Sequence, residues 1–292
     1  MEGWMSALID GINKGAIYAL VALGYSMVYG IVKLINFAHG DIIMVGGYVM
    51  FIVMKTLGLP LPAAIAAAVL FCGLLGMLIE KVGYSRLIRK EAPRISLLIT
   101  AIGMSLLLQN LAQAIFGANS QAMPTIVPKG HLPFLNISYS TIVTIVTAVV
   151  LMVALQMFVG HTRLGKAMRA TSEDTGAAKL MGINTSVVIA FTFGIGSALA
   201  AVGSVLYLSS IPQVNPMMGS MLGLKAFVAA VLGGIGSIPG AMIGGLALGV
   251  AESLTTQLGL SDITDAVVFG ILILVLVIKP SGLMGKNMTE KV

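Results

Sequence analysis

The sequence predicts an all-α protein that crosses a membrane about eight times (seven to nine). Of its 292 residues, 58% are hydrophobic and only 10% are charged. Soluble globular proteins carry about 25% charged residues, so lipid must cover part of this apolar surface. The mean hydropathy of +1.01 agrees with this class. Glycine is frequent, with 35 residues, and small residues let helices in a membrane approach closely.

Long apolar stretches place the expected helices in order along the chain. A helix that spans a bilayer needs roughly 20 predominantly apolar residues, and most of the stretches approach this length. Together they predict a single transmembrane domain over residues 1–292. The stretches are residues 12–30, 42–54, 63–79, 95–116, 142–159, 187–208, 221–254 and 263–278.

Basic residues between the apolar stretches predict the orientation of the chain. Two groups lie in residues 81–94 and 161–179. Cytoplasmic loops are enriched in Lys and Arg, so we expect these segments inside the cell, and the polar loop 117–138 outside. A third group, also expected inside, lies in the C-terminal tail at Lys279, Lys286 and Lys291.

Two interruptions predict broken or re-entrant segments. Gly and Pro in the run GGIGSIPG, residues 233–240, end one helix. Both flanking basic segments are expected inside, so residues 221–254 must cross twice or not at all, as two shorter helices or a re-entrant pair. The second interruption lies near residues 36–41. Similarly spaced glycines follow both, which indicates a possible internal repeat of the kind found in transporters.

The side on which the N-terminus lies depends on the early stretches. If every early stretch spans the membrane, the N-terminus is outside. If one of them only dips into the membrane, the N-terminus is inside. The acidic residues Glu2 and Asp10 favour the outside.

The chain is not expected to bind ATP, a metal or another cofactor. Residues 160–167, GHTRLGKA, resemble a phosphate-binding loop, but Ala167 replaces the Ser or Thr that binds magnesium. Such a loop also follows a buried strand, whereas this one follows an apolar stretch. His39, His131 and His161 are far apart, and no cluster of Cys or carboxylates supports them as metal ligands.

Residues 161–185 form the most informative cytoplasmic segment. They are polar but contain small apolar residues, which suits a short helix that docks into a cleft of a soluble partner; a solvated helical loop is the alternative. The run AAKLMG at residues 177–182 resembles the coupling loop of ABC import permeases, although Gly176 stands where that motif usually has Glu. The resemblance implies contact with an ATPase at Gly165, Arg169, Ala170, Glu173, Asp174, Ala177, Ala178, Leu180 and Gly182.

Two longer runs extend this resemblance. Residues 15–48 are similar to the opening of LivH-type permeases of branched-chain amino acid importers, and residues 223–245 are similar to their C-terminal signature. The resemblance implies a multi-pass subunit of the bacterial inner membrane that transports leucine, isoleucine or valine. It also implies a second, related permease in a heterodimer, two ATPase subunits that bind ATP and Mg, and a periplasmic amino-acid-binding protein. Urea-type permeases share the INFAHGD style of motif, which leaves the substrate open.

Five polar residues in apolar surroundings are candidates for the substrate pathway. Ionisable groups at membrane depth are costly and usually mark a pathway or a paired site. Three of the five lie at the first interruption, where a loop at the cytoplasmic interface is the open alternative. The other two lie in the fourth stretch, where bonding between helices is favoured over lining the route. The candidates are Asn36, His39, Asp41, Gln109 and Asn110.

Glycines in the last third of the chain predict close helix packing. Glycines four residues apart give a helix one smooth face, against which another backbone can pack. Farther along, Glu252 either lies at an aqueous edge or pairs with a basic neighbour such as Lys225. The expected packing glycines are Gly236, Gly240, Gly244, Gly245 and Gly249.

Two other classes of function compete with the ABC permease. A transporter of small amino acids or amides driven by an ion gradient predicts intramembrane carboxylates, and Asp41 alone is a poor supply. An intramembrane enzyme would need a nucleophile with a base or a metal cluster, and the sequence shows neither. Few polar groups are available to hold a zwitterion, which suits a weakly specific route whose selectivity resides in a binding protein.

Overall fold

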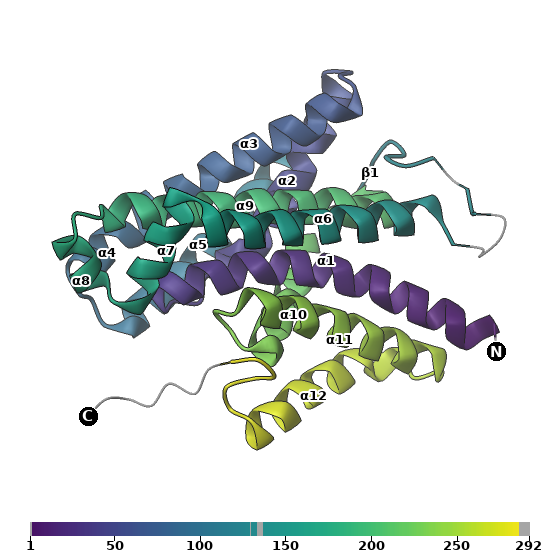
Figure 1. The fold of residues 1–292 in the computed structure, drawn as a ribbon. Helices are drawn as coiled ribbons and strands as arrows, with labels where there is room; N and C mark the ends of the chain where they lie inside the picture. The colour runs from purple at the N-terminus through teal and green to yellow at the C-terminus, as the bar shows by residue number, and fades with distance from the viewer. Residues whose placement is uncertain (1, 129, 133–136, 286–292) are drawn as a thin grey trace.

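The computed structural model describes residues 2–128, 130–132 and 137–285, and helices dominate it (Figure 1). π-helical turns prolong α2 to Thr56 and α3 to Tyr84. The helices are α1 (Glu2–Val32), α2 (Ala38–Phe51), α3 (Leu61–Ile79), α4 (Ser85–Arg89), α5 (Arg94–Phe116), α6 (Tyr139–His161), α7 (Arg163–Glu173), α8 (Thr175–Leu180), α9 (Thr185–Ser210), α10 (Met218–Gly233), α11 (Ile238–Gln257) and α12 (Thr264–Ile278), and the strands are β1 (Gln121–Ala122) and β2 (Gln213–Val214).

Eight helices are long and apolar enough to cross a membrane. They are α1, α5, α6, α9, α11, and α2, α3 and α12 with their adjoining π or 3₁₀ turns. α10 is also apolar but has only 16 residues, which rise about 24 Å. The prediction of an all-α membrane protein with about eight spans is confirmed.

Residues 221–254 lie in two helices, which is one of the two arrangements that the sequence allows. α10 and α11 run in opposite directions side by side, so that Gly244 lies against Ala229. The turn between them has positive φ at Gly234 (103°) and Gly236 (92°), a backbone conformation that favours glycine. The glycine-rich run therefore makes a tight connection at the end of two helices.

The interruption after α1 is also a connection between helices, over residues 33–37. The Tyr84 hydroxyl, at the end of α3, donates a hydrogen bond to Asn36 Oδ1 (2.9 Å), which places this connection beside the basic loop 81–94. The α10–α11 turn lies nearby: a Cβ built on Gly30 would be 3.6 Å from the Gly236 Cα. Both interruptions thus lie at the cytoplasmic ends of helices. The internal repeat stays a prediction.

The order of the helices gives one orientation. α1, α2 and α3 alternate in direction, so with the basic loop after α3 inside, as its charge predicts, we expect the N-terminus outside. On the outer side, β1 pairs antiparallel with β2 and joins the loop after α5 to the connection between α9 and α10. α12 then ends at the cytoplasm with Lys279; Lys286 and Lys291 lie outside the described residues.

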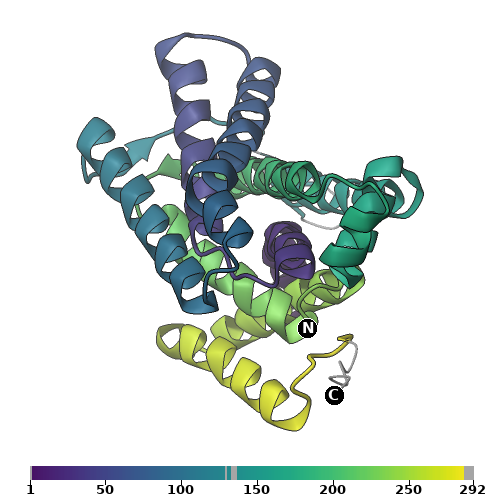
Figure 2. The ribbon, with the colours of Figure 1, turned by 90° about the vertical axis from the view of Figure 1, so that its left-hand side faces the viewer.

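α1 is the central helix of the bundle. Viewed end-on, it is surrounded by α6, α9, α10 and α11 (Figure 2), and residues 15–28 are all buried. The outer helices α3, α5, α6 and α12 expose large apolar side chains, among them Leu74, Ile99, Val150 and Ile273. Lipid is the medium that can cover such a surface.

Candidate functional site

A polar cluster lies between the cytoplasmic ends of α1, α2 and α3. Asn36 accepts the hydrogen bond from Tyr84 described above. The His39 ring is buried and meets Tyr25 edge to face, with ring centroids 4.6 Å apart. A Cβ on Gly24 would overlap the His39 imidazole, so this glycine makes room for the ring. His39 Nε2 has no hydrogen-bond partner among the described residues.

Asp41 joins three helices through Gln109. The Gln109 Nε2 of α5 donates to Asp41 Oδ1 on α2 (2.9 Å) and to Ser220 Oγ on α10 (3.2 Å). Asn110 is exposed on α5 and donates to the Leu106 carbonyl of its own helix (2.7 Å). Gln109 therefore bonds neighbouring helices, whereas Asn110 makes no such bond among the described residues. A role for the five candidates in the substrate pathway stays a prediction.

A cavity of about 640 Å³ lies at the opposite, extracytoplasmic end of the bundle. Sites for small molecules typically enclose roughly 300–1,000 Å³. The first turns of α1 and α10 and the last turns of α9 and α11 form its wall, so segments from both ends of the chain meet there. None of the five pathway candidates lines it. Its charged and strongly polar side chains include Asp10, Asn13, Lys14, Tyr18, Lys225 and Glu252.

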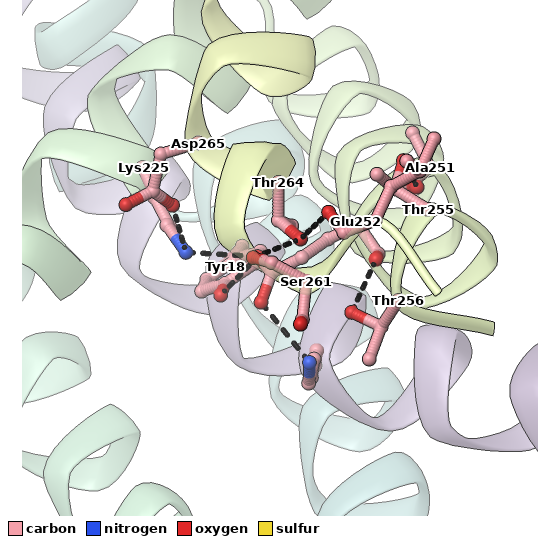
Figure 3. Close-up of polar contacts among 11 residues, drawn as sticks. Tyr18, Lys225, Ala251, Glu252, Thr255, Thr256, Ser261, Thr264 and Asp265 are labelled. Carbon is pink, nitrogen blue, oxygen red and sulfur yellow. Dashed lines mark hydrogen bonds and ion pairs between the residues drawn. The ribbon is translucent and has the colours of Figure 1, made fainter. Parts of the chain in front are cut away.

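Glu252 on α11 is the centre of this polar wall (Figure 3). Its Oε1 accepts from Lys14 Nζ (3.0 Å), and its Oε2 accepts from Tyr18 Oη (2.7 Å) and Lys225 Nζ (3.2 Å). Lys225 also pairs with Asp265 on α12 at 2.9 Å. The Glu252 side chain is only 8% exposed, and a buried carboxylate needs such partners because its desolvation is costly. Glu252 thus both pairs with Lys225 and lines a cavity.

Small residues bring α11 against α1 and thereby assemble the Glu252 network. Gly245 lies against Ala19, and Gly249 lies against Gly15; a Cβ on either α11 glycine would overlap the α1 backbone. Residues three and four apart share a helix face, so Glu252 also faces α1. The close approach of the two backbones is what places a carboxylate of α11 beside Lys14 and Tyr18.

The remaining glycines of the predicted packing face lie on the other side of α11 or outside it. Gly240 and Gly244 meet the α10 backbone. Gly236 belongs to the turn, because α11 begins only at Ile238. The four-residue spacing from Gly236 to Gly244 therefore does not form one helix face.

Segment 161–185, which the sequence predicts to be cytoplasmic, contains two short helices, α7 and α8. Asp174 caps α8, since its Oδ1 accepts from two backbone N–H groups of the first turn at 2.7 and 2.9 Å. Gly182 follows α8 with a φ of 83°. Between them, Leu180 is 90% exposed and Met181 is 83% exposed. Large apolar side chains that stand in water in this way are suited to contact with another protein.

The other coupling candidates divide into buried and exposed residues. Gly165 packs against the backbone at the end of α6, and Ala178 is also buried. Arg169 donates to the Gly160 carbonyl at 3.1 Å and so fastens α7 to α6. These three residues hold the segment in place. The exposed candidates are Arg169, Ala170, Glu173, Asp174, Ala177, Leu180 and Gly182.

Sequence reasoning missed most of the outer cavity. Asn13, Lys14 and Tyr18 were not singled out, although a lysine inside an apolar stretch is itself a signal of a paired site. Among the described residues, no group of three or more His, Cys, Asp or Glu side chains is placed to hold a metal ion.

Comparison with known proteins identifies the family. Residues 7–277 match the family described as branched-chain amino acid transport system / permease component. The high-affinity branched-chain amino acid transport system permease protein BraD of Pseudomonas aeruginosa is 43% identical, with 99% of this chain and 98% of BraD covered. LivH of Escherichia coli K12, a permease protein of the same description, is 42% identical with the same coverage. The chain belongs to the family of permease components of branched-chain amino acid transport systems.

Proposed function

We propose that this chain is the membrane-spanning permease subunit of an ABC importer that carries leucine, isoleucine and valine across the bacterial inner membrane. The observation that carries this proposal is the 42–43% identity, over nearly the whole chain, to permeases of high-affinity branched-chain amino acid transport. The eight membrane-spanning helices fit a multi-pass protein of that membrane. The family assignment gives no support to the ion-gradient alternative. The chain is a transporter subunit and not an enzyme.

The partners follow from the same proposal. Two separate ATPase subunits bind ATP and Mg and dock on the cytoplasmic segment, where Leu180 and Met181 are exposed. A second, related permease completes the pathway as a heterodimer. A periplasmic amino-acid-binding protein delivers the solute to the outer ends of the helices, the side on which the 640 Å³ cavity lies.

The cytoplasmic segment has a short physical link to the transmembrane helices. Met168 and Arg169 of α7 line a space of about 80 Å³ together with Gly30 of α1 and Gly236 of the α10–α11 turn. A shift of α7 would therefore press on the ends of the central helix and of the α10–α11 pair. Contact between backbones at Gly30 and Gly236 transmits such a shift because no flexible side chain lies between them.

ATP-dependent uptake of radiolabelled leucine into proteoliposomes tests the proposal. The liposomes contain this chain, the candidate partner permease, the two ATPases and the binding protein, and each component is omitted in turn. We expect uptake only with ATP and only when every component is present, and competition by isoleucine and valine but not by urea. Leucine entry that ignores ATP and follows an imposed ion gradient would overturn the assignment.

A further inference from the structure

We propose that the outer cavity is a binding site for the zwitterionic amino acid itself, so that this subunit selects the solute and does not merely conduct it. The inference rests on the proposed function for its solute class. Its own grounds are the charges, the unsatisfied Asn13 Oδ1 and the apolar side chains that four helices bring together around 640 Å³. Each of these features matches one part of a branched-chain amino acid.

Lys14 provides the site for the solute carboxylate. An ammonium group has three hydrogen-bond donors, and Lys14 Nζ gives one hydrogen bond, to Glu252, among the described residues. Its side chain is 41% exposed, whereas the Lys225 side chain is 14% exposed and Lys225 already pairs with two carboxylates. A carboxylate in the cavity can therefore bind the remaining donors of Lys14 while Lys14 keeps its bond to Glu252.

Asn13 and Asp10 provide acceptors for the solute ammonium. The Asn13 Oδ1 is buried in the cavity wall without a hydrogen-bond partner among the described residues, and a buried acceptor left in this state is costly unless a ligand or water meets it. Asp10 lies on the same wall, one helical turn before Lys14. Acceptors and donors thus stand side by side on α1, as the two charges of a zwitterion do.

Part of the cavity has an apolar lining. Met217, Met218, Met221 and Leu222, at the start of α10, line it, and Met217 and Met221 are 55% and 46% exposed. Methionine side chains are unbranched and adapt to irregular shapes. A wall of methionines can therefore accept the side chains of leucine, isoleucine and valine. Leucine and isoleucine differ in the position of the branch, and valine has one methylene group fewer.

The charge balance of the cavity favours a zwitterion over an ion. The charged side chains that line the cavity are Asp10, Lys14, Lys225 and Glu252, so two positive charges stand against two negative charges. An isolated anion or cation would leave one charge unmatched in a poorly hydrated site. A solute that carries both charges adds none, provided that each of its charged groups meets its own partner.

The test measures equilibrium binding to the assembled transporter in lipid nanodiscs, without the binding protein and without ATP. The probes are leucine, leucinamide, which lacks the carboxylate, and 4-methylpentanoate, which lacks the ammonium. We expect leucine to bind, and each analogue to bind at least about tenfold more weakly, because each loses a charge-assisted contact. The analogue series needs no variant, so it is independent of any folding defect.

Two variants then locate the site. Asn13→Leu removes the unsatisfied acceptor and should weaken leucine binding at least about tenfold. Asn119→Leu is the matched control: it makes the same substitution at an exposed position that does not line the cavity, and should leave binding unchanged. The same preparations are assayed for thermal stability, which separates loss of the site from loss of the fold.

The outcomes separate this inference from the proposed function. Absence of leucine binding at millimolar concentration, equal binding of leucine and both analogues, or full binding by Asn13→Leu would each overturn the inference. Uptake in the complete system would still stand in those cases, with selection by the binding protein alone. If ATP-dependent uptake fails while leucine still binds in nanodiscs more tightly than its analogues, the proposed function is overturned and the binding site stands.

Discussion

Glu252 shows how a single residue is made acceptable within a membrane protein. Its carboxylate receives three hydrogen bonds, from two lysines and a tyrosine. Removing the negative charge would leave Lys14 and Lys225 with one carboxylate, that of Asp265, between them. Uncompensated charge in a low-dielectric site is strongly destabilising. Glu252 therefore stabilises the cavity wall, whichever solute the cavity holds.

Glu252→Gln should lower the stability of the protein by about 3 kcal/mol, the usual effect of breaking a buried ion pair from one side. The measurement is thermal unfolding of the detergent-solubilised chain. The readout is the reaction of a thiol-specific dye with Cys72, which is buried in the folded protein. Asp265→Asn is the control, because Asp265 is 49% exposed and its pair with Lys225 contributes less. Equal shifts in both variants would contradict the account.

The α1–α11 pair shows what glycine does at the scale of a helix. Its contact surface is backbone against backbone, at Gly15 with Gly249 and at Ala19 with Gly245. Lipid provides no hydrophobic drive to press helices together, so close contact must provide the attraction. The same contact sets the register in which Glu252 meets its partners. The close packing of α1 against α11 therefore also positions the residues of the cavity.

Gly249→Ala should separate α1 from α11 and cost about 1–3 kcal/mol, as overpacking of a tight contact does. Gly270→Ala is the control on α12, where no atom lies within 4 Å of the added methyl group. Thermal unfolding of both variants in the same detergent provides the comparison. A stable Gly249→Ala protein would show that the helices can part without loss.

Gly182 tests the coupling segment. Its φ of 83° is a conformation that a β-branched residue adopts only with strain, about 1–2 kcal/mol. Gly182→Val should therefore displace the exposed end of α8 and reduce ATP-driven uptake several-fold, with normal amounts of protein in the membrane. Gly160→Ala, with no atom within 4 Å and no positive φ, should transport normally. Normal uptake by Gly182→Val would remove the coupling role.

The orientation of the whole molecule is set by charge. The basic segments 81–94 and 163–179 lie at one end of the bundle, and the cavity, with Lys14 and Lys225, and the β1–β2 pair lie at the other. In a Cys72→Ala background, Ser6→Cys should react with an impermeant maleimide on intact cells, and Lys90→Cys only after permeabilisation. Both positions are exposed. Labelling at Lys90→Cys in intact cells would invert the topology.

Much of the architecture could be predicted, because a helix that spans a bilayer must be predominantly apolar over about 20 residues. The apolar stretches, the basic loops and the turn at residues 233–240 all follow from local composition. The outer cavity could not, since Lys14 and Glu252 are 238 positions apart and nothing local relates them. The sequence shows few polar groups that could hold a zwitterion, and a role of this cavity in holding one stays a prediction. Four of the six polar side chains named for the cavity come from α1, but Lys225 and Glu252 come from α10 and α11, and only the fold brings them beside α1.

The pairing of β1 with β2 has a mechanical consequence. β2 lies between α9 and α10, next to Asn215 and Met217 on the rim of the cavity, and β1 belongs to the long outer loop after α5. The backbone hydrogen bonds between β1 and β2 connect the outer loop to the rim of the cavity. We therefore expect a displacement of the outer loop to be passed through this pairing to the rim of the cavity.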